Sequence, residues 1–483
     1  MTKKQKTTLF VLVLIYTAIF SSVSIVNHYF FRTHAHDLGI ETNTIFDYAH
    51  FRVNDCMLMQ PQFNNVLSDH FSILPMVYSP LIYIFGSYTL LIVQLLFILI
   101  GGIGIYKYVS LKAKDNWLGI LATVHFFSLW GIYTALAFDA HNNVMAAMIV
   151  PWFFYFFEKN QLKKAFLFFA LVISAKENMA LWTLFIAIGL LLVNFKNKER
   201  RKFLFLMAIT SVVYFITVMQ FIMPALANDG RAYLHFEYHA LGNNFGEVVV
   251  NILKHPIKTF SLFFENHSGE AIYDTYKSEL HFIILLSGGI ALFIRPQFLI
   301  MLIPIYAQKL FSDDAIKWGL GYHYSIEFVP IITIALFTCI NELKAIKLKY
   351  VTAGLAISTT IFCTLYTVNS AQSIPYLKEE LQFTKGIHYK RNFDINNVYD
   401  LMKLIPANAN VSASNVIAPH LSLRDYIYLF PVVQNAEYII LLDDGDAYPL
   451  TSDQMKGEIA KLLASPEWKL EKKEGIVYLF RKV

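Results

Sequence analysis

Ionisable side chains of this chain are concentrated in a few short motifs. The first, His34-Ala-His36-Asp37-Leu-Gly-Ile-Glu41, places two carboxylates and two imidazoles within eight residues. If this stretch is helical, Asp37 and Glu41 share one face, because residues four apart lie one above the other. Such groups suit a general base or a site for Mg²⁺ or Mn²⁺. A solvated polar loop is the alternative interpretation.

Two further motifs combine carboxylates with imidazoles. Ser68-Asp69-His70-Phe71-Ser72 directly precedes an apolar stretch, so Asp69 could also cap a helix there. Phe138-Asp139-Ala140-His141-Asn142-Asn143 forms a polar turn between two apolar runs, and a capped connection between helices is the alternative for it. We expect Asp69, His70, Asp139 and His141 to line a cavity, to orient a substrate or to hold a metal ion. The metal hypothesis concerns Asp37, Asp69 and His70.

Basic groups next to hydrocarbon indicate where an anion could bind. Lys176-Glu177-Asn178 interrupts an apolar stretch from 164 to 195, and such charges are costly unless they are paired or functional. Phosphate binding by Lys176 and a mutual Lys176–Glu177 ion pair are both open. Arg231, in a long loop, and His323 with Tyr324, in Gly321-Tyr-His-Tyr-Ser325, are further candidates for contact with a phosphate.

The composition indicates what must position these motifs. Of 483 residues 56% are hydrophobic and only 16% are charged, and the mean hydropathy is +0.46. This is more apolar surface than the core of a soluble domain needs, and it is typical of a chain whose side chains face the lipid bilayer. We expect about eleven transmembrane helices in an all-α polytopic protein, at residues 8–26, 88–106, 117–136, 142–157, 164–175, 178–195, 203–223, 281–294, 298–311, 324–340 and 349–369. The net charge of +5 requires no nucleic-acid partner.

The lysines predict the orientation of the chain. If the N-terminus is cytoplasmic and the spans alternate, every short basic connection falls on the cytoplasmic side. The C-terminus then lies outside, in a multi-pass protein of the cell membrane. All the motifs above reach the same extracytoplasmic face, although they are far apart in sequence.

The same pattern divides the chain into two domains. Residues 1–369 form the transmembrane domain, with outer loops at 27–72 and 224–280 and a re-entrant stretch at 73–86. Residues 370–483 have the composition of a small soluble α/β domain, hereafter the tail. Strands are expected at 411–414, 426–430, 438–442 and 476–480, and a helix at 453–464. Asp443-Asp444-Gly445-Asp446 follows a strand and is interpreted as a solvated turn, with a metal or nucleotide-sugar site as the alternative, because adjacent carboxylates attract divalent ions.

The combined motifs resemble a known family. HDLGI, DHFS, the Phe-Asp-x-His turn, the later Lys-Glu pair and the tail segments 411–414 and 419–424 are similar to those of a family of predicted bacterial membrane proteins related to the C-type glycosyltransferases. The chain departs from that pattern at Asn142, where proline is expected, and at Asn178, where aspartate is expected.

The resemblance implies a membrane enzyme of the C-type glycosyltransferase fold. Such enzymes move a sugar from a polyprenyl-phosphate carrier to an extracytoplasmic acceptor (a glycan, a lipid or a protein) and invert the anomeric centre. Asp37 would be the base and Glu41 its closest competitor. His36, Asp69, His70, Asp139, His141, Lys176, Glu177, Arg231, His323 and Tyr324 would bind substrate. A secondary transporter and a non-catalytic assembly or sensor protein are the alternatives, although transporters keep their coupling residues near the midplane.

Overall fold

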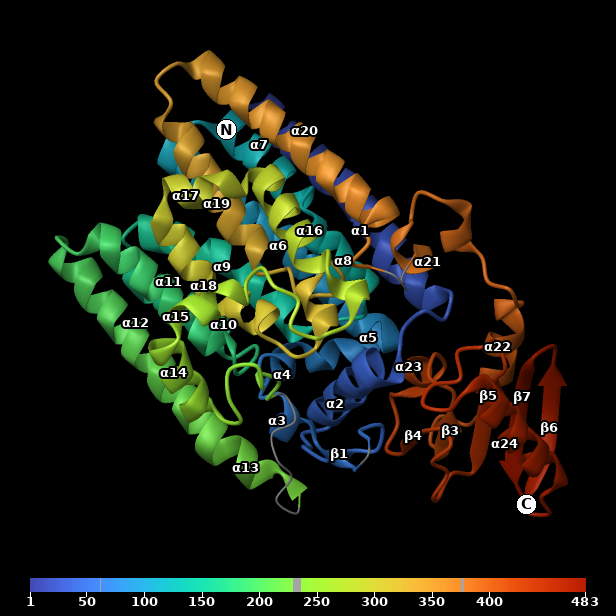
Figure 1. Ribbon diagram of the computed structural model, residues 1–483. Helices are drawn as coiled ribbons and strands as arrows, with labels where there is room; N and C mark the ends of the chain where they lie inside the picture. Colours follow the sequence, from blue (N-terminus) through green and yellow to red (C-terminus); the bar gives the residue numbers. More distant parts are fainter. Residues whose placement is uncertain (61, 229–235, 375–377) are drawn as a thin grey trace.

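The computed structural model shows a helical bundle with a small sheet domain at one end (Figure 1). It describes residues 1–483 except 61, 229–235 and 375–377. The expected apolar runs fall mainly on helices: α1 (Lys3–Tyr29), α6 (Thr89–Ala113), α7 (Asn116–Phe127), α8 (Trp130–Ala137), α9 (Asn142–Glu158), α10 (Leu162–Ile173), α11 (Met179–Asn194), α12 (Lys198–Thr217), α16 (Tyr276–Ile284), α17 (Ile290–Ile294), α18 (Pro296–Leu310), α19 (Phe328–Glu342) and α20 (Ile346–Ser370). The predicted all-α membrane domain is confirmed.

Local sequence explains where several of these helices begin. The Thr2 hydroxyl accepts from the Gln5 N–H while the Gln5 side chain accepts from the Thr2 N–H, which gives α1 a capping box. The Asp115 carboxylate caps α7 in the same position.

Fewer helices are long enough to cross a membrane than the eleven spans expected from the apolar runs. In the described part of the chain, five helical segments are long and apolar enough to cross a membrane, and a sixth is added if α7 and α8, bent by 44°, form one span. The five are Lys3–Tyr29, Pro75–Ala113, Lys198–Leu226, Ala271–Ile294 and Ile346–Ser370. The other expected spans are shorter helices, so the total of eleven stays a prediction.

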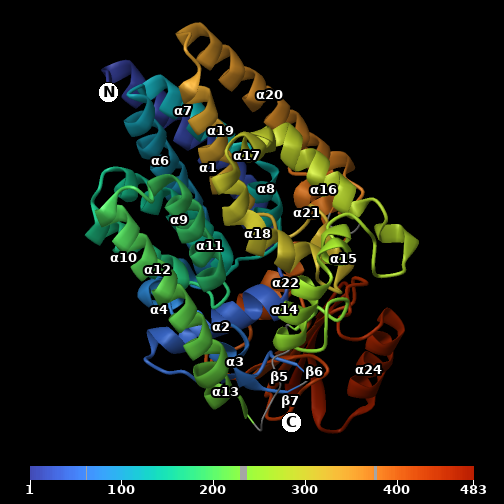
Figure 2. The ribbon, with the colours of Figure 1, turned by 60° about the vertical axis from the view of Figure 1, so that its left-hand side comes forward.

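The outer loops contain short elements that cover one end of the bundle (Figure 2). Loop 27–72 holds the π-helical turn η1 (Ala35–Gly39), α2 (Ile40–Ala49), the strand pair β1 (Asp55–Cys56) and β2 (Asn64–Asn65), and α3 (Val66–Asp69). The expected re-entrant stretch consists of α4 (Pro75–Tyr78), η2 (Ser79–Leu81), α5 (Ile82–Phe85) and η3 (Gly86–Tyr88), which lead into α6. Around 224–280 lie η4 (Val218–Ile222), α13 (Met223–Leu226), α14 (Phe245–Lys254), α15 (Pro256–Ser261) and η6 (Ala271–Tyr273).

The tail forms a five-stranded mixed sheet in the order β4-β3-β5-β7-β6. Its strands are β3 (Val411–Ala413), β4 (Ile427–Leu429), β5 (Tyr438–Leu442), β6 (Trp468–Glu474) and β7 (Val477–Lys482), and its helices include α21 (Lys378–Leu381), α22 (Ile395–Met402), α23 (Ala418–Leu421) and α24 (Ser452–Ala464). All four expected strands and the expected helix are present. Edge strand β6 was missed because its side chains are mostly charged and exposed, which conceals the apolar signal of a strand.

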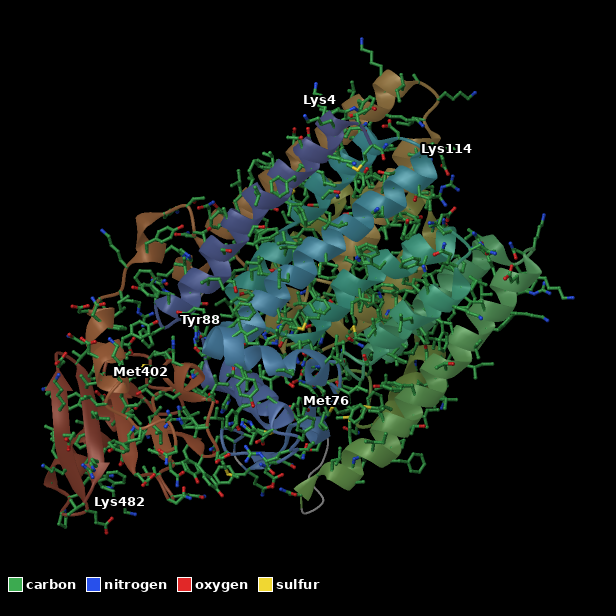
Figure 3. All side chains as sticks on the ribbon, turned by 180° about the vertical axis from the view of Figure 1, so that it is seen from behind. Lys4, Met76, Tyr88, Lys114, Met402 and Lys482 are labelled. Carbon is green, nitrogen blue, oxygen red and sulfur yellow. The ribbon has the colours of Figure 1, made fainter. Side chains whose placement is uncertain are left out.

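The tail is docked on the first outer loop. Phe31, Cys56 and Leu58 of that loop lie in one hydrophobic cluster with Val411, Ile440 and other tail residues. The tail and the lysines that are predicted to face the cytoplasm lie at opposite ends of the molecule. In Figure 3, Lys4 and Lys114 are far from Met402 and Lys482. This arrangement agrees with the predicted orientation of the chain.

The run of tail carboxylates at 443–446 is not simply a solvated turn. The Asp444 side chain is only 3% exposed and accepts a hydrogen bond from the Arg391 guanidinium at 2.5 Å. The interpretation as a solvated turn is therefore wrong for Asp444. The Arg391 cation compensates the cost of burying this carboxylate.

Candidate active site

The segment that carries Asp37 and Glu41 is helical, which is the condition under which these two residues share a face. The turn η1 runs directly into α2, and the Gly39 N–H donates to the His34 carbonyl at 3.0 Å. This hydrogen bond joins residues five apart, instead of four apart as in an α-helix, and so widens the turn. Such π-helical turns are frequent at functional sites. The charge of Glu41 acts on the Asp37 carboxyl group, so the two carboxyl groups lie in one electrostatic environment.

Asp139 fixes the start of this helix. Its side chain is fully buried, and its Oδ2 accepts from the His34 N–H at 3.0 Å and from the Leu38 N–H at 3.3 Å. His34 Nδ1 also lies 3.7 Å from the same oxygen. Gln94 of α6 holds the polar turn itself, because it donates to the Asp139 carbonyl at 3.0 Å and accepts from the His141 N–H at 2.9 Å. The motif at 138–143 thereby positions the motif at 34–41.

Glu41 is joined to the same turn by Asn142. Asn142 Nδ2 donates to both Glu41 carboxylate oxygens, at 3.2 and 3.3 Å. The neighbouring Asn143 donates to Glu327 Oε1 at 2.8 Å and to the His323 carbonyl at 3.4 Å. Asn142, which departs from the family pattern, is thus in contact with one of the two candidate bases.

His141 and His323 stack with their ring centroids 3.7 Å apart. Burial, together with the charges of Lys176 and His70, lowers the pKa of His141 to about 3. Burial also lowers the pKa of His323 well below its usual range. Both imidazoles are neutral at physiological pH, so they can form hydrogen bonds but supply no positive charge.

A third group of contacts joins the motifs at 68–72 and 176–178. His70 Nδ1 lies 3.3 Å from Glu177 Oε1, and His70 Nε2 lies 3.3 Å from Lys176 Nζ. Glu177 Oε2 accepts from the Phe71 N–H at 3.0 Å, and Asp69 Oδ2 lies 3.9 Å from His70 Nε2. Lys176 and Glu177 are therefore connected through His70.

Both candidate bases titrate near neutral pH. Asp37 is half-buried, and burial together with the charge of Asp139 raises its pKa to about 7, against the opposing charges of His34 and Lys176. Burial also raises the pKa of Glu41 to about 7, against the hydrogen bond from Asn142 and the charge of Lys176. A carboxyl group that titrates near the working pH is suited to general-base catalysis. Lys176 lies within electrostatic range of both carboxyl groups.

His34 supplies a second positive charge. Burial lowers its pKa, but the hydrogen bond and charge of Asp139, with further contributions from Glu380 and Asp446 of the tail, outweigh this and raise it to about 10. Glu380 is half-buried, and burial raises its pKa to about 8. At neutral pH it is therefore the Asp446 carboxylate of the tail that adds negative charge to the environment of the first outer loop.

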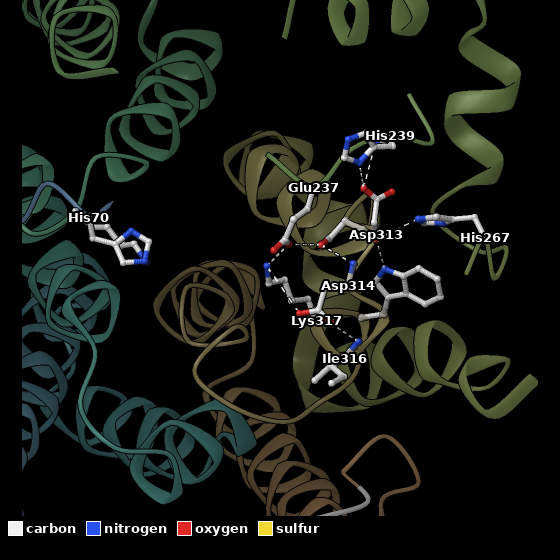
Figure 4. A network of polar contacts seen from close by, with 11 residues as sticks. His70, Glu237, His239, His267, Asp313, Asp314, Ile316 and Lys317 are labelled. Atoms are coloured by element: carbon white, nitrogen blue, oxygen red, sulfur yellow. Dashed lines mark hydrogen bonds and ion pairs between the residues drawn. The ribbon is translucent and has the colours of Figure 1, made fainter. Parts of the chain in front are cut away.

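The remaining predicted residues lie around this centre. His36 contacts the tail, because the Tyr448 hydroxyl is 3.3 Å from His36 Nδ1. Tyr324 is within electrostatic range of Asp37. Arg231 falls outside the described residues. Further along the same loop, Glu237 binds Lys317, and His239 Nδ1 lies 2.7 Å from Asp313 Oδ2 (Figure 4).

The metal hypothesis concerns Asp37, Asp69 and His70. Among the described residues, no three His, Cys, Asp or Glu side chains are grouped so that they could hold an ion. Of the predicted ligands, His70 already shares its two ring nitrogens with Glu177 and Lys176. Dependence on Mg²⁺ or Mn²⁺ stays a prediction, and no step below requires it.

Three polar residues of the site are not predicted by the motifs. Gln94 and Glu327 lie in or beside apolar runs, and a buried polar group within such a run is a usable signal. Glu380 lies in the tail and has no signal of its own, because only the docking of the tail brings it near His34.

Comparisons with known proteins agree with this arrangement. Residues 27–470 match the model of a family described as "Predicted membrane protein (DUF2079)". The fold is similar to that of ArnT from Cupriavidus metallidurans, in a crystal structure bound to undecaprenyl phosphate, with a TM-score of 0.57 over 100% of this chain and 99% of that one. The two sequences are 9% identical, so the likeness shows the fold alone, which is the fold that the resemblance implied. No curated protein matches the sequence.

Proposed function

The chain belongs to the DUF2079 family of predicted membrane proteins, and we propose that it is a glycosyltransferase that moves a sugar from a polyprenyl phosphate to an extracytoplasmic acceptor. The observation that supports this most is the convergence of Asp37, Glu41 and Lys176 at the tail-facing end of the bundle. A base and a cation in one place are what a one-step transfer from a phosphate needs. The ArnT structure, which holds undecaprenyl phosphate in the same fold, agrees with such a donor.

In the proposed reaction the acceptor hydroxyl attacks the anomeric carbon of the sugar. Its proton passes to the Asp37 carboxylate as the new carbon–oxygen bond forms. The bond between the anomeric carbon and the phosphate oxygen breaks on the opposite face, so the anomeric centre is inverted. Polyprenyl phosphate leaves with the bonding electron pair. Glu41, held by Asn142, is the alternative base.

Lys176 is proposed to meet the phosphate. Its ammonium lies 3.3 Å from His70 Nε2, which leaves part of its hydrogen-bonding capacity for an incoming anion. His141 and His323, both neutral, would donate hydrogen bonds to sugar or phosphate oxygens. Asp69, Glu177, Tyr324, His36 and Arg231 are kept as proposed substrate contacts, and Asp139 positions the catalytic helix.

Two exposed apolar surfaces are proposed to border the path of the polyprenyl chain. Val77 and Ile84, in the stretch before α6, are at least 70% exposed. In the loop 224–280, Leu253 of α14 and Ile257 of α15 are also largely exposed. Such side chains are stable against lipid rather than water. These surfaces support the proposal that the catalytic end of the bundle lies at the outer surface of the cell membrane.

The function is tested with the purified full chain in liposomes. Vesicles contain a polyprenyl-phosphate sugar with a radiolabelled sugar, and an extract of cell-envelope glycans and lipids supplies acceptors. We expect time-dependent loss of label from the polyprenyl lipid and its appearance in the acceptor fraction. Accumulation of free solute inside the vesicles without any transfer would instead support a transporter and contradict the proposal.

A further inference from the structure

We infer that Asn415 of the tail is a positioning residue for Asp37, so that the tail forms part of the catalytic unit. The inference rests on the proposed function for its kinetic consequence. Its structural part stands independently of that function, because it concerns which side chain holds the turn η1.

The first turn of the catalytic helix has backbone donors that need partners from elsewhere, because the N-terminal N–H groups of a helix have none within it. The Ala35 N–H donates to Asn415 Oδ1 at 3.0 Å. The N–H groups of His34 and Leu38 donate to Asp139. The turn is therefore capped from two sides, by one residue of the bundle and one residue of the tail.

Asn415 is presented by a rigid part of the tail. It is buried and comes two residues after the end of β3. The preceding Ser414 is fixed to the next strand, because its N–H donates to the Ile440 carbonyl at 3.1 Å and its hydroxyl accepts from the Leu442 N–H at 2.9 Å. The position of the Asn415 amide is thus set by the sheet and not by a loose loop.

A second contact holds the same helix two residues beyond Glu41. Asn43 Nδ2 donates to the carbonyls of Ser422 at 3.0 Å and Arg424 at 2.9 Å. The Arg424 guanidinium in turn donates to the Leu421 and Ala409 carbonyls, which fixes this segment of the tail. Asp37 and Glu41 therefore lie between two points at which the tail holds their helix.

This geometry predicts a particular kinetic effect. Displacement of a catalytic group by about 1 Å can lower the rate of the chemical step by about 10²-fold. Lys176 and His70 lie on other segments, so binding of the phosphate should change little. Loss of the Asn415 cap should therefore lower kcat and leave KM for the lipid donor nearly unchanged.

The test compares Asn415→Leu, which removes the acceptor oxygen, with Asn415→Asp, which keeps it at a position where a helix start favours negative charge. Asn392→Leu, at an exposed tail position, is the control. Hydrogen exchange of the amides at 35–41 and the kinetics of sugar transfer are measured on the full chain. We expect Asn415→Leu to speed exchange at these amides about ten-fold and to lower kcat by ~10-fold or more, with both restored in Asn415→Asp.

The outcomes separate this inference from the proposed function. Exchange and kcat in Asn415→Leu equal to those of the control would overturn the inference, and so would equal losses in Asn415→Asp. If the parent transfers no sugar, the proposed function fails while the exchange comparison still decides whether Asn415 holds the turn. If Asn415→Leu yields too little folded protein, Asn415→Ala removes the same oxygen without added bulk and is judged by the same criteria.

Discussion

At the scale of single residues, the site combines carboxyl groups that titrate near pH 7 with a small number of charges. Burial raises the pKa of Asp37 and of Glu41, while Lys176 limits both shifts. The types of these residues could be predicted from their motifs. Their hydrogen-bond partners could not, because Asn142 and His70 reach them only after distant segments fold together.

The pKa values predict how transfer depends on pH. The base must be ionised, and the folded-state pKa values of Asp37 and Glu41 are about 7, above the usual range. We therefore expect kcat/KM to fall as pH decreases through about 7, with an apparent value that belongs to the interacting pair. A rate profile between pH 5 and 9 measures this. An acidic limb near pH 4 would show that neither carboxyl group has the raised pKa.

We expect Lys176 to contribute to the affinity for the phosphate and not to the stability of the fold. Lys176→Gln removes a charge-assisted hydrogen bond worth about 1.5–3 kcal/mol, so we expect affinity for polyprenyl phosphate to fall by about ten-fold or more. Lys163→Gln, at an exposed position in α10, is the matched control. Affinity is measured from the quenching of tryptophan fluorescence by the lipid in detergent. Equal affinities of the two variants would remove Lys176 from the phosphate site.

At the scale of elements, the apolar runs predicted where the helices lie, and the alternation of residues predicted four tail strands. Neither pattern could predict that η1 is a π-helical turn held by Asp139 and Asn415, because capping by remote residues leaves no local signal. The same limit applies to the bend of 44° between α7 and α8.

The orientation of these elements is tested by labelling with a cysteine reagent that does not cross the membrane. We expect Asn435→Cys in the tail and Asn243→Cys in the outer loop to react in intact cells, and Asn197→Cys before α12 to react only after lysis. All three positions are exposed. Asn43, in the first outer loop, is unsuitable although it faces the same side, because its side chain is buried against the tail. Labelling of Asn197→Cys alone in intact cells would show that the chain has the opposite orientation and would contradict the predicted topology.

At the scale of the whole molecule, the tail and the first outer loop form one folded unit. The tail is long enough to fold alone. Its hydrophobic cluster nevertheless includes Leu58 and Phe31 of the loop. The composition predicted a separate domain, but surface complementarity between two segments more than 300 residues apart has no sequence pattern.

Truncation of a loop residue should therefore destabilise the tail. Leu58 is fully buried, and Leu58→Ala should lower the stability of the docked tail by about 2–5 kcal/mol. Leu463→Ala, about half exposed on α24, should have little effect. Pulse proteolysis in increasing urea, followed by detection of an epitope at the C-terminus, measures the difference. Equal midpoints for the two variants would mean that the tail is stable without the loop.

The most direct measurement is the rate of sugar transfer from polyprenyl phosphate by Asp37→Asn relative to the parent. Asparagine keeps the shape of the side chain and removes the charge that accepts the proton. Asp453→Asn, at an exposed tail position, is the control; Asp47 is unsuitable because it pairs with Arg52. We expect Asp37→Asn to fold normally and to lose about 10²–10⁴-fold in rate. Transfer within a few-fold of the parent would contradict the assignment of Asp37 as the base.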